Sequence, residues 1–299
     1  MTNALPAAGA SGKVRELPGH LTAHPGFVDA VAALSRGEDV TWDGVWGSSC
    51  ALVAAALVQH VAGMLVIVSP HQDDADAFCD DLKLFSERPA ERFPAWEAEP
   101  GERILHDEIY GERLRTLKRL LDATAAASGA GETPLKLIVT SIQSLLQPAP
   151  SRDLLAANSR RLQVGHPVDV PAYLRWLVEG GFHNTSAVEL PGEFASRGGI
   201  LDIFAPDWYQ PIRIEFFGDE VASIRRFDVA SQRSLESLDS AEVTILGSPV
   251  GDRAHFSDYL PPQTVVLLME PEQAEAESQR YLQRLERPSD CHNFAAVMR

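Results

Sequence analysis

Basic residues, cysteines and long apolar runs are all scarce in this sequence. Its 299 residues contain 26 Lys and Arg against 42 Asp and Glu, which gives a formal net charge of −16. Such a charge repels polyphosphate, so the chain is not expected to bind DNA unaided without a local basic patch. An acidic surface that keeps a protein soluble is the alternative meaning of the same excess.

Cysteine is present at only three widely spaced positions, Cys50, Cys79 and Cys291. The odd number and the absence of a CxxC pair predict neither a disulfide framework nor a zinc site. We therefore expect a reducing compartment, the cytoplasm, and no metal or other cofactor in this segment. No Ser-His-Asp or Cys-His arrangement is apparent, so we predict no catalytic residues.

The most apolar stretch, residues 51–68, is interrupted by Gln59, His60 and Gly63. A buried helix over 51–61 followed by a buried strand over 64–68 explains it better than a membrane span. Residues 1–25 are rich in Ala, Gly and Pro and lack the continuous apolar region of a secretory signal. They are predicted to be a mobile leader.

Strand and helix patterns alternate through residues 26–150, which predicts an α/β domain with a parallel sheet. Strands are expected at 40–46, 64–68 and 135–140, and helices at 73–85, 107–127 and 141–146. Carboxyl ends of such strands are where a nucleotide site would be sought.

The stretch Gly44 to Ala51 has the outline of a phosphate-binding loop without its chemistry. A P-loop needs G-x-x-x-x-G-K-[ST], because glycines let backbone amides surround the phosphates, Lys neutralises charge and the hydroxyl holds magnesium. Aligned from Gly44, this sequence has Gly47 and Ser48 inside the loop and then Ser49, Cys50 and Ala51 at the last three positions. ATP hydrolysis here is not expected, although amides at the helix start could still attract an anion. A buried structural role is preferred for Cys50 over a reactive thiol.

Pro148 to Ser151 cannot continue regular structure and marks a boundary, after which an inserted, strand-rich α+β domain is predicted over 151–247. Asp169 is a helix cap there, and Gly180-Gly181 ends the helix. Residues 248–299 contain a predicted buried strand (264–269) and a helix (272–287). They are expected to return to the first domain, apparently truncated.

The centre of the inserted domain, residues 190–228, is punctuated by turns. Residues 200–204 and 212–217 are β-prone, and the second run alternates apolar and charged side chains as a half-buried strand does. Gly218-Asp219 predicts a tight hairpin with residues 220–227 as the returning strand. Gly198-Gly199 predicts an earlier sharp bend or bulge.

Three blocks of this region, residues 192–204, 213–220 and 227–234, resemble the UvrA-interacting domain shared by the repair protein UvrB and the transcription-repair coupling factors. The resemblance implies a degenerate P-loop domain of the helicase or UvrB-like type around the inserted domain. Coupling factors have lost the ATPase motifs of this module and UvrB retains them, which agrees with Ser49, Cys50 and Ala51.

The resemblance also implies a UvrA-binding site built from arginines, of which only Arg197 falls on a match. His183 and Ala195 occupy the positions of two others, and Glu193 and Phe194 belong to the same motif. Arginine suits such a contact because its planar fork makes bidentate bonds to carboxylates. The alternative is that Arg197 pairs inside its own domain, with Glu193 or Asp202.

Four aromatic residues recur at strand spacing and are predicted to be core rather than a stacking platform: Phe194, Phe204, Phe216 and Phe227. The acidic residues Glu215, Asp219 and Glu220 are predicted to be solvent-facing parts of the hairpin.

The function that this resemblance implies is the amino-terminal module of a transcription-repair coupling factor. That module recruits UvrA to stalled RNA polymerase for transcription-coupled nucleotide excision repair, and it docks proteins rather than catalysing. RNA polymerase and DNA would be bound by downstream domains, including an ATP-dependent DNA translocase, and the carboxy-terminal part would mask the docking face. The alternatives are a UvrB-type ATPase acting on damaged DNA and a generic α/β protein that binds something unrelated.

Overall fold

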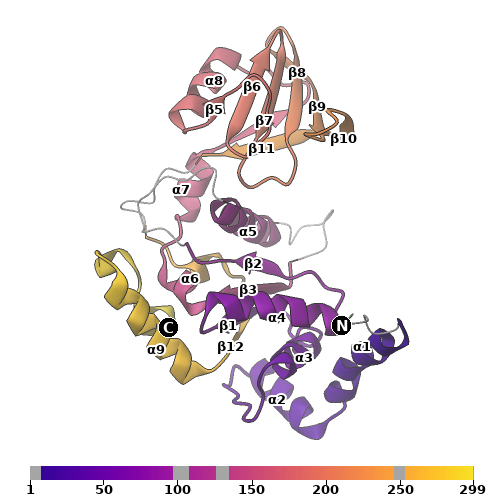
Figure 1. Cartoon of the computed structure of the whole chain (residues 1–299), viewed down its shortest axis with the longest axis vertical. Coiled ribbons are helices and arrows are strands. Elements are labelled where there is room, and N and C mark those ends of the chain that lie inside the picture. Colours follow the sequence, from indigo (N-terminus) through magenta and orange to yellow (C-terminus); the bar gives the residue numbers. More distant parts are fainter. Residues whose placement is uncertain (1–7, 97–107, 126–134, 246–252, 299) are drawn as a thin grey trace, which may run out of the picture. The chain divides into compact units, whose positions relative to one another are not determined.

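The computed structural model describes residues 8–96, 108–125, 135–245 and 253–298 (Figure 1). The chain divides into two compact units, which are described separately. The first consists of Met1–Ala95, Arg119–Gln147 and His255–Arg299, and the second of Trp96–Lys118 and Pro148–Ala254. Parallel and antiparallel sheets occur together, so the chain is an α/β protein.

The first unit contains a four-stranded parallel sheet with the order β12-β1-β3-β2. Its strands are β1 (Leu65–Ser69), β2 (Glu91–Phe93), β3 (Leu137–Ser141) and β12 (Val265–Leu268). Every residue of β1 and β3 is buried, which explains why both read as continuous apolar runs instead of alternating ones. The register places Leu65 of β1 between Leu137 and Val265.

Helices of the first unit supply the rest of its core. They are α1 (Ala8–Thr22), α2 (Pro25–Ser35), α3 (Ser48–Leu57), α4 (Gln72–Phe85), α6 (Ile142–Leu146), α9 (Pro271–Arg284) and α10 (Phe294–Val297), with short 3₁₀ helices η2 (Phe256–Tyr259) and η3 (Pro288–Asp290). Ala54 of α3 and Phe78 of α4 pack with Ile67 and Val139 in one buried cluster. Helix α5 (Glu108–Ala125) belongs to the second unit as far as Lys118 and to the first from Arg119.

Three predictions for the first unit need correction. Residues 40–46 form no strand, because a turn at Asp43-Gly44 with positive φ at Gly44 interrupts extended backbone, and Trp42 packs on Phe27 instead. Residues 8–22 of the predicted leader are the helix α1, whose Leu21 packs against the core. Strand β12 is half-exposed, not buried, because it is the edge strand of the sheet.

The second unit contains a six-stranded sheet with the order β10-β9-β8-β7-β6-β5, antiparallel except for the β5 and β6 pair. Its strands are β5 (His183–Asn184), β6 (Glu193–Arg197), β7 (Ile200–Phe204), β8 (Ile212–Phe217), β9 (Glu220–Phe227) and β10 (Ser234–Leu238). Gly198 and Gly199 connect β6 to β7 with positive φ, and Gly218 does so between β8 and β9. The hairpin predicted at Gly218-Asp219 is thus confirmed, and the sharp bend predicted at Gly198-Gly199 is the turn of a second hairpin.

One face of this sheet packs against α8 (Val170–Glu179), which Tyr173 and Leu177 anchor in a core with Phe194 and Ile214. The Asp169 side chain accepts a hydrogen bond from the Ala172 amide at 2.9 Å, so the predicted helix cap is confirmed. A short helix and a two-stranded antiparallel sheet complete the unit: α7 (Arg152–Ala157), β4 (Ser159–Gln163) and β11 (Ser240–Thr244).

Candidate functional site

The candidate site is the face of the six-stranded sheet that points away from the α8 core, called the outer face below. Side chains alternate between the two faces of a strand. Because Ile212 and Ile214 of β8 lie in the α8 core, Arg213, Glu215 and Phe217 belong to the outer face. By the strand register, this face also contains Arg197, Ile200, Asp202, Ser223 and Arg225, together with a buried apolar cluster of Ala195, Phe204 and Phe227.

Arg197 is the last residue of β6 and its side chain is exposed. Its guanidinium donates a hydrogen bond to the backbone carbonyl of Ser186. Within the residues that the structure describes, Arg197 forms no ion pair, so neither Glu193 nor Asp202 is the internal partner that the sequence suggested. No carboxylate of the described residues therefore neutralises its positive charge.

Glu193, the first residue of β6, stabilises the turn that precedes the strand. Its Oε2 accepts hydrogen bonds from the amides of Glu189 at 2.8 Å and Leu190 at 2.9 Å. These bonds hold the turn that leads into the strand. The carboxylate is thus already engaged, and we do not assign it to a partner contact.

Phe194 belongs to the predicted binding motif and was also predicted to be a core residue, and its burial confirms the core prediction. Only 1% of Phe194 is exposed, because the side chain points into the core beneath α8. Phe204 and Phe227 are buried too, as predicted, and Phe216 packs partly buried against the core. A partner could reach Phe194 only by displacing the helix.

His183 lies on β5 with an exposed side chain. Its backbone amide donates to the Gly192 carbonyl at 2.9 Å, and it pairs with Glu193 in the register of β6. Arg197 is four residues further along β6, about 13 Å away at 3.3 Å per residue. His183 and Arg197 are thus separate points of the same sheet edge.

Two ion pairs run across the outer face where the sequence predicted only solvent-facing hairpin residues. Arg213 donates to both carboxylate oxygens of Asp202, at 2.7 and 2.8 Å, and Asp202 is buried. This hydrogen-bonded pairing raises the pKa of Arg213 above its usual value. The alternation of charged and apolar residues along β7 and β8 was the signal that could have revealed this arrangement.

The second pair is formed by Glu215 and Arg225, 2.5 Å apart, with the Ser223 hydroxyl donating to the same carboxylate oxygen at 2.8 Å. The Ser223 hydrogen bond and then the Arg225 charge lower the pKa of Glu215. Glu215 is therefore part of a network and is not simply a solvated hairpin residue.

Phe217 was not singled out from the sequence, yet it is 85% exposed on the outer face. Ile200, 39% exposed, is its apolar neighbour on the adjacent strand. Exposed aromatic side chains beside an arginine are typical of protein-binding surfaces. The outer face therefore combines an unneutralised cation, a charge network and an apolar end.

The candidate phosphate loop, Gly44 to Ala51, lies in the first unit. Gly44 and Gly47 have positive φ, and α3 begins at Ser48 with no side-chain cap. The Ser49 and Cys50 amides donate to the carbonyls of Trp46 and Gly47. Cys50 and Ala51 are buried, so their side chains cannot line a phosphate site. Burial raises the pKa of the Cys50 thiol, in agreement with the structural role predicted for it.

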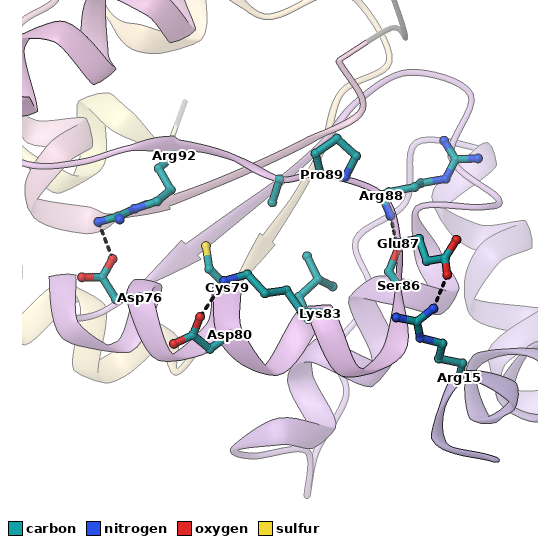
Figure 2. A pocket seen from close by; sticks show the side chains of 12 residues that line it. Arg15, Asp76, Cys79, Asp80, Lys83, Ser86, Glu87, Arg88, Pro89 and Arg92 are labelled. Carbon is teal, nitrogen blue, oxygen red and sulfur yellow. Dashed lines mark hydrogen bonds and ion pairs between the residues drawn. The ribbon is translucent and has the colours of Figure 1, made fainter. Parts of the chain in front are cut away.

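A hollow of about 700 Å³ lies beside α4 in the first unit (Figure 2). Three of the four basic side chains around it are ion-paired, in the pairs Arg15–Glu87, Arg92–Asp76 and Lys83–Asp80. The thiol of Cys79 faces the hollow, and burial raises its pKa to about 11. The thiol is thus protonated near neutral pH, and the hollow has neither a nucleophile nor a concentrated positive charge.

No group of three or more His, Cys, Asp or Glu side chains among the described residues is arranged to hold a metal ion. No helix in the described parts of the chain is long and apolar enough to cross a membrane.

Residues 161–246, which contain the six-stranded sheet and α8, match the family model of the UvrB interaction domain. Three relatives are transcription-repair-coupling factors. The Mycobacterium bovis protein is 39% identical over 63% of this chain, the Myxococcus xanthus protein 32% over 73%, and the Escherichia coli protein 27% over 65%.

The match over residues 161–246 shows that the chain contains a UvrB interaction domain. Over 63–73% of its length the chain is similar to these transcription-repair-coupling factors. The aligned part covers 15%, 18% and 16% of the three relatives, so this chain spans a small fraction of their length.

Proposed function

We propose that this chain is the amino-terminal, UvrB-like module of a transcription-repair coupling factor. Its role is to recruit UvrA to stalled RNA polymerase for transcription-coupled nucleotide excision repair. It acts by docking and not by catalysis, in the cytoplasm and without a cofactor of its own. The observation that carries the proposal is the exposed, unneutralised Arg197 on a domain that matches the UvrB interaction family.

Arg197 suits a docking role for electrostatic reasons. The chain as a whole is strongly acidic, and among the described residues Arg197 has only a neutral carbonyl as its partner. A partner carboxylate would form a charge-assisted bond with its guanidinium. His183 at the same sheet edge is a second, weaker contact in this proposal, because an imidazole offers fewer N–H donors than the five of a guanidinium.

The remaining parts of the proposal concern segments beyond this chain. RNA polymerase and DNA are bound there, ATP-driven translocation occurs there, and the carboxy-terminal part masks the docking face until activation. Within this chain, Gly44 to Ala51 is the remnant of a nucleotide loop. The buried Cys50 and Ala51 support this part, since neither can replace the lysine and hydroxyl that a P-loop requires. A UvrB-type ATPase is accordingly not favoured.

The test is a titration of the full chain with purified UvrA beside an Arg197→Glu variant. Loss of a hydrogen bond to a charged group is worth about 1.5–3 kcal/mol, so we expect affinity to fall roughly 10- to 150-fold. Arg175→Glu is the matched control, because Arg175 is an exposed arginine of the same unit on α8. Equal affinity of both variants, each folded by circular dichroism, would remove Arg197 from the site.

A further inference from the structure

Phe217 has the most exposed large apolar side chain among the described residues, with 85% of it in solvent. It ends β8 immediately before the hairpin turn at Gly218. An aromatic ring in water is unfavourable for the isolated chain, and a hairpin turn can be made with polar residues instead. Its position therefore calls for an explanation outside the packing of the second unit.

The strand register connects Phe217 of β8 to Arg197 of β6 through Ile200 of β7. Arg197 is opposite Ile200 across the β6 and β7 pair, and Ile200 is opposite Glu215 across β7 and β8. Phe217 is two residues beyond Glu215 on the same face. Diagonal neighbours of this kind lie about 7–8 Å apart, within reach of an aromatic side chain. Phe217, Ile200 and Arg197 thus form one continuous patch, called the hairpin patch below.

The backbone under the hairpin patch is held in place. The Phe216 amide donates to the Gly199 carbonyl at 2.8 Å, which ties the end of β8 to the turn between β6 and β7. The Phe216 side chain packs against the α8 core, so the strand cannot rotate to bury Phe217 in its place. A ring presented on a fixed strand loses little conformational freedom when a partner covers it.

Charge around the hairpin patch indicates what kind of surface would cover it. Glu215 is already satisfied by Ser223 and Arg225, whereas Arg197 has only a neutral carbonyl as partner among the described residues. A complementary surface would carry an apolar recess with a carboxylate at its rim. A nucleic acid is disfavoured as the occupant, because the formal net charge of −16 repels its phosphates.

We propose that Phe217 is the apolar anchor through which the outer face binds UvrA. Its ring enters an apolar recess of UvrA, Ile200 packs along the edge of that recess, and Arg197 binds a carboxylate at its rim. This inference rests on the proposed function, since UvrA is the partner assigned to the outer face.

Its test uses the full chain with Phe217→Ala and Phe217→Leu, titrated with UvrA by calorimetry. Anchors in the centre of an interface typically lose 2 kcal/mol or more on truncation, so we expect at least a roughly 30-fold loss for Phe217→Ala. Phe217→Leu keeps an apolar group and should lose less. Val178→Ala is the control, because Val178 is 56% exposed on α8, the opposite layer of the same unit.

A second readout separates the anchor from the charge. The loss caused by Phe217→Ala should be the same at low and high salt, whereas the loss caused by Arg197→Glu should shrink as salt screens the charge. Circular dichroism and thermal melts establish that each variant is folded.

The outcomes separate the two proposals. If the unaltered chain does not bind UvrA, the proposed function fails. If Arg197→Glu weakens binding and Phe217→Ala binds as the unaltered chain does, the function stands and the anchor is wrong. Sedimentation velocity of the chain alone is the last arm, since self-association abolished by Phe217→Ala would make a second copy the occupant and overturn the assignment to UvrA.

Discussion

At the scale of single residues, the second unit contains a buried ion pair between Lys118 and Asp207, which could not be predicted from the sequence. Lys118 of α5 donates to Asp207 at 2.9 Å, and their side chains are 15% and 5% exposed. Asp207 Oδ1 has no hydrogen-bond partner, so Lys118 is the group that neutralises this carboxylate. Lys118 also contacts Glu242 at 3.4 Å. The pair thereby connects α5 to residues about 90 and 120 positions away in the chain.

We predict that Lys118→Met destabilises the second unit by about 3 kcal/mol, because removing one partner leaves a buried charge uncompensated. Urea unfolding followed by tryptophan fluorescence gives the free energy of unfolding. Lys83→Met is the control, since Lys83 pairs with Asp80 on the exposed surface of α4 and such pairs contribute little. Adding Asp207→Leu to Lys118→Met should recover most of the loss, and a double variant no more stable than the single one would contradict this account.

At the scale of elements, close approach of backbones decides where α5 lies in the second unit. Gly111 faces the carbonyl of Pro206, and a Cβ at this position would overlap that oxygen. The Arg115 side chain then donates to the Asp207 carbonyl at 2.9 Å and stacks on Tyr209. A single glycine thus allows the helix to reach the segment between β7 and β8.

Gly111→Ala should therefore lower stability by about 1–2 kcal/mol. The clash of the new methyl group with the backbone destabilises the unit by more than the higher helix propensity of alanine stabilises it. Gly19→Ala in α1 has the opposite expectation, a gain of up to about 1 kcal/mol, because nothing lies within 4 Å of its Cβ. Hydrogen exchange of peptides from residues 200–212 should increase only in the first variant. Equal stabilisation by both alanines would show that the approach of α5 is not tight.

At the scale of the whole molecule, the acidic charge and the loop from Gly44 to Ala51 bear on whether the chain binds DNA or ATP. The charge of −16 opposes binding to DNA, and the side chains of Cys50 and Ala51 at the start of α3 are buried. Any contact of this chain with the repair machinery should then be made through protein surfaces, which agrees with its UvrB interaction domain.

We predict no magnesium-dependent ATP turnover above background and no DNA mobility shift at physiological salt for this chain. Both follow from charge and loop composition, so Cys50→Lys alone should not create activity while Ala51 stays without a hydroxyl. Turnover that disappears on altering Cys50 or Ala51 would sink the first expectation. A shift that persists at 150–200 mM salt, where about six phosphate contacts would already be strongly weakened, would sink the second.

Local patterns in the sequence determined most of the elements. Continuous apolar runs gave β1 and β3, the alternating run gave β8, and Asp169 gave the start of α8. The sequence blocks around Arg197 also predicted the UvrB interaction domain, because turn residues and strand periodicity depend only on neighbouring residues.

Tertiary structure decided what neighbouring residues cannot encode. Residues 40–46 are apolar enough for a strand, but a turn at Asp43-Gly44 interrupts them and Trp42 packs on Phe27, so they form a loop. Burial separated Phe194, which lies in the core, from Phe217, which stands in solvent, although both are phenylalanines on strands. The physical reason is that exposure and ion pairing depend on which strands and helices lie side by side, and that is settled by contacts between residues far apart in the chain.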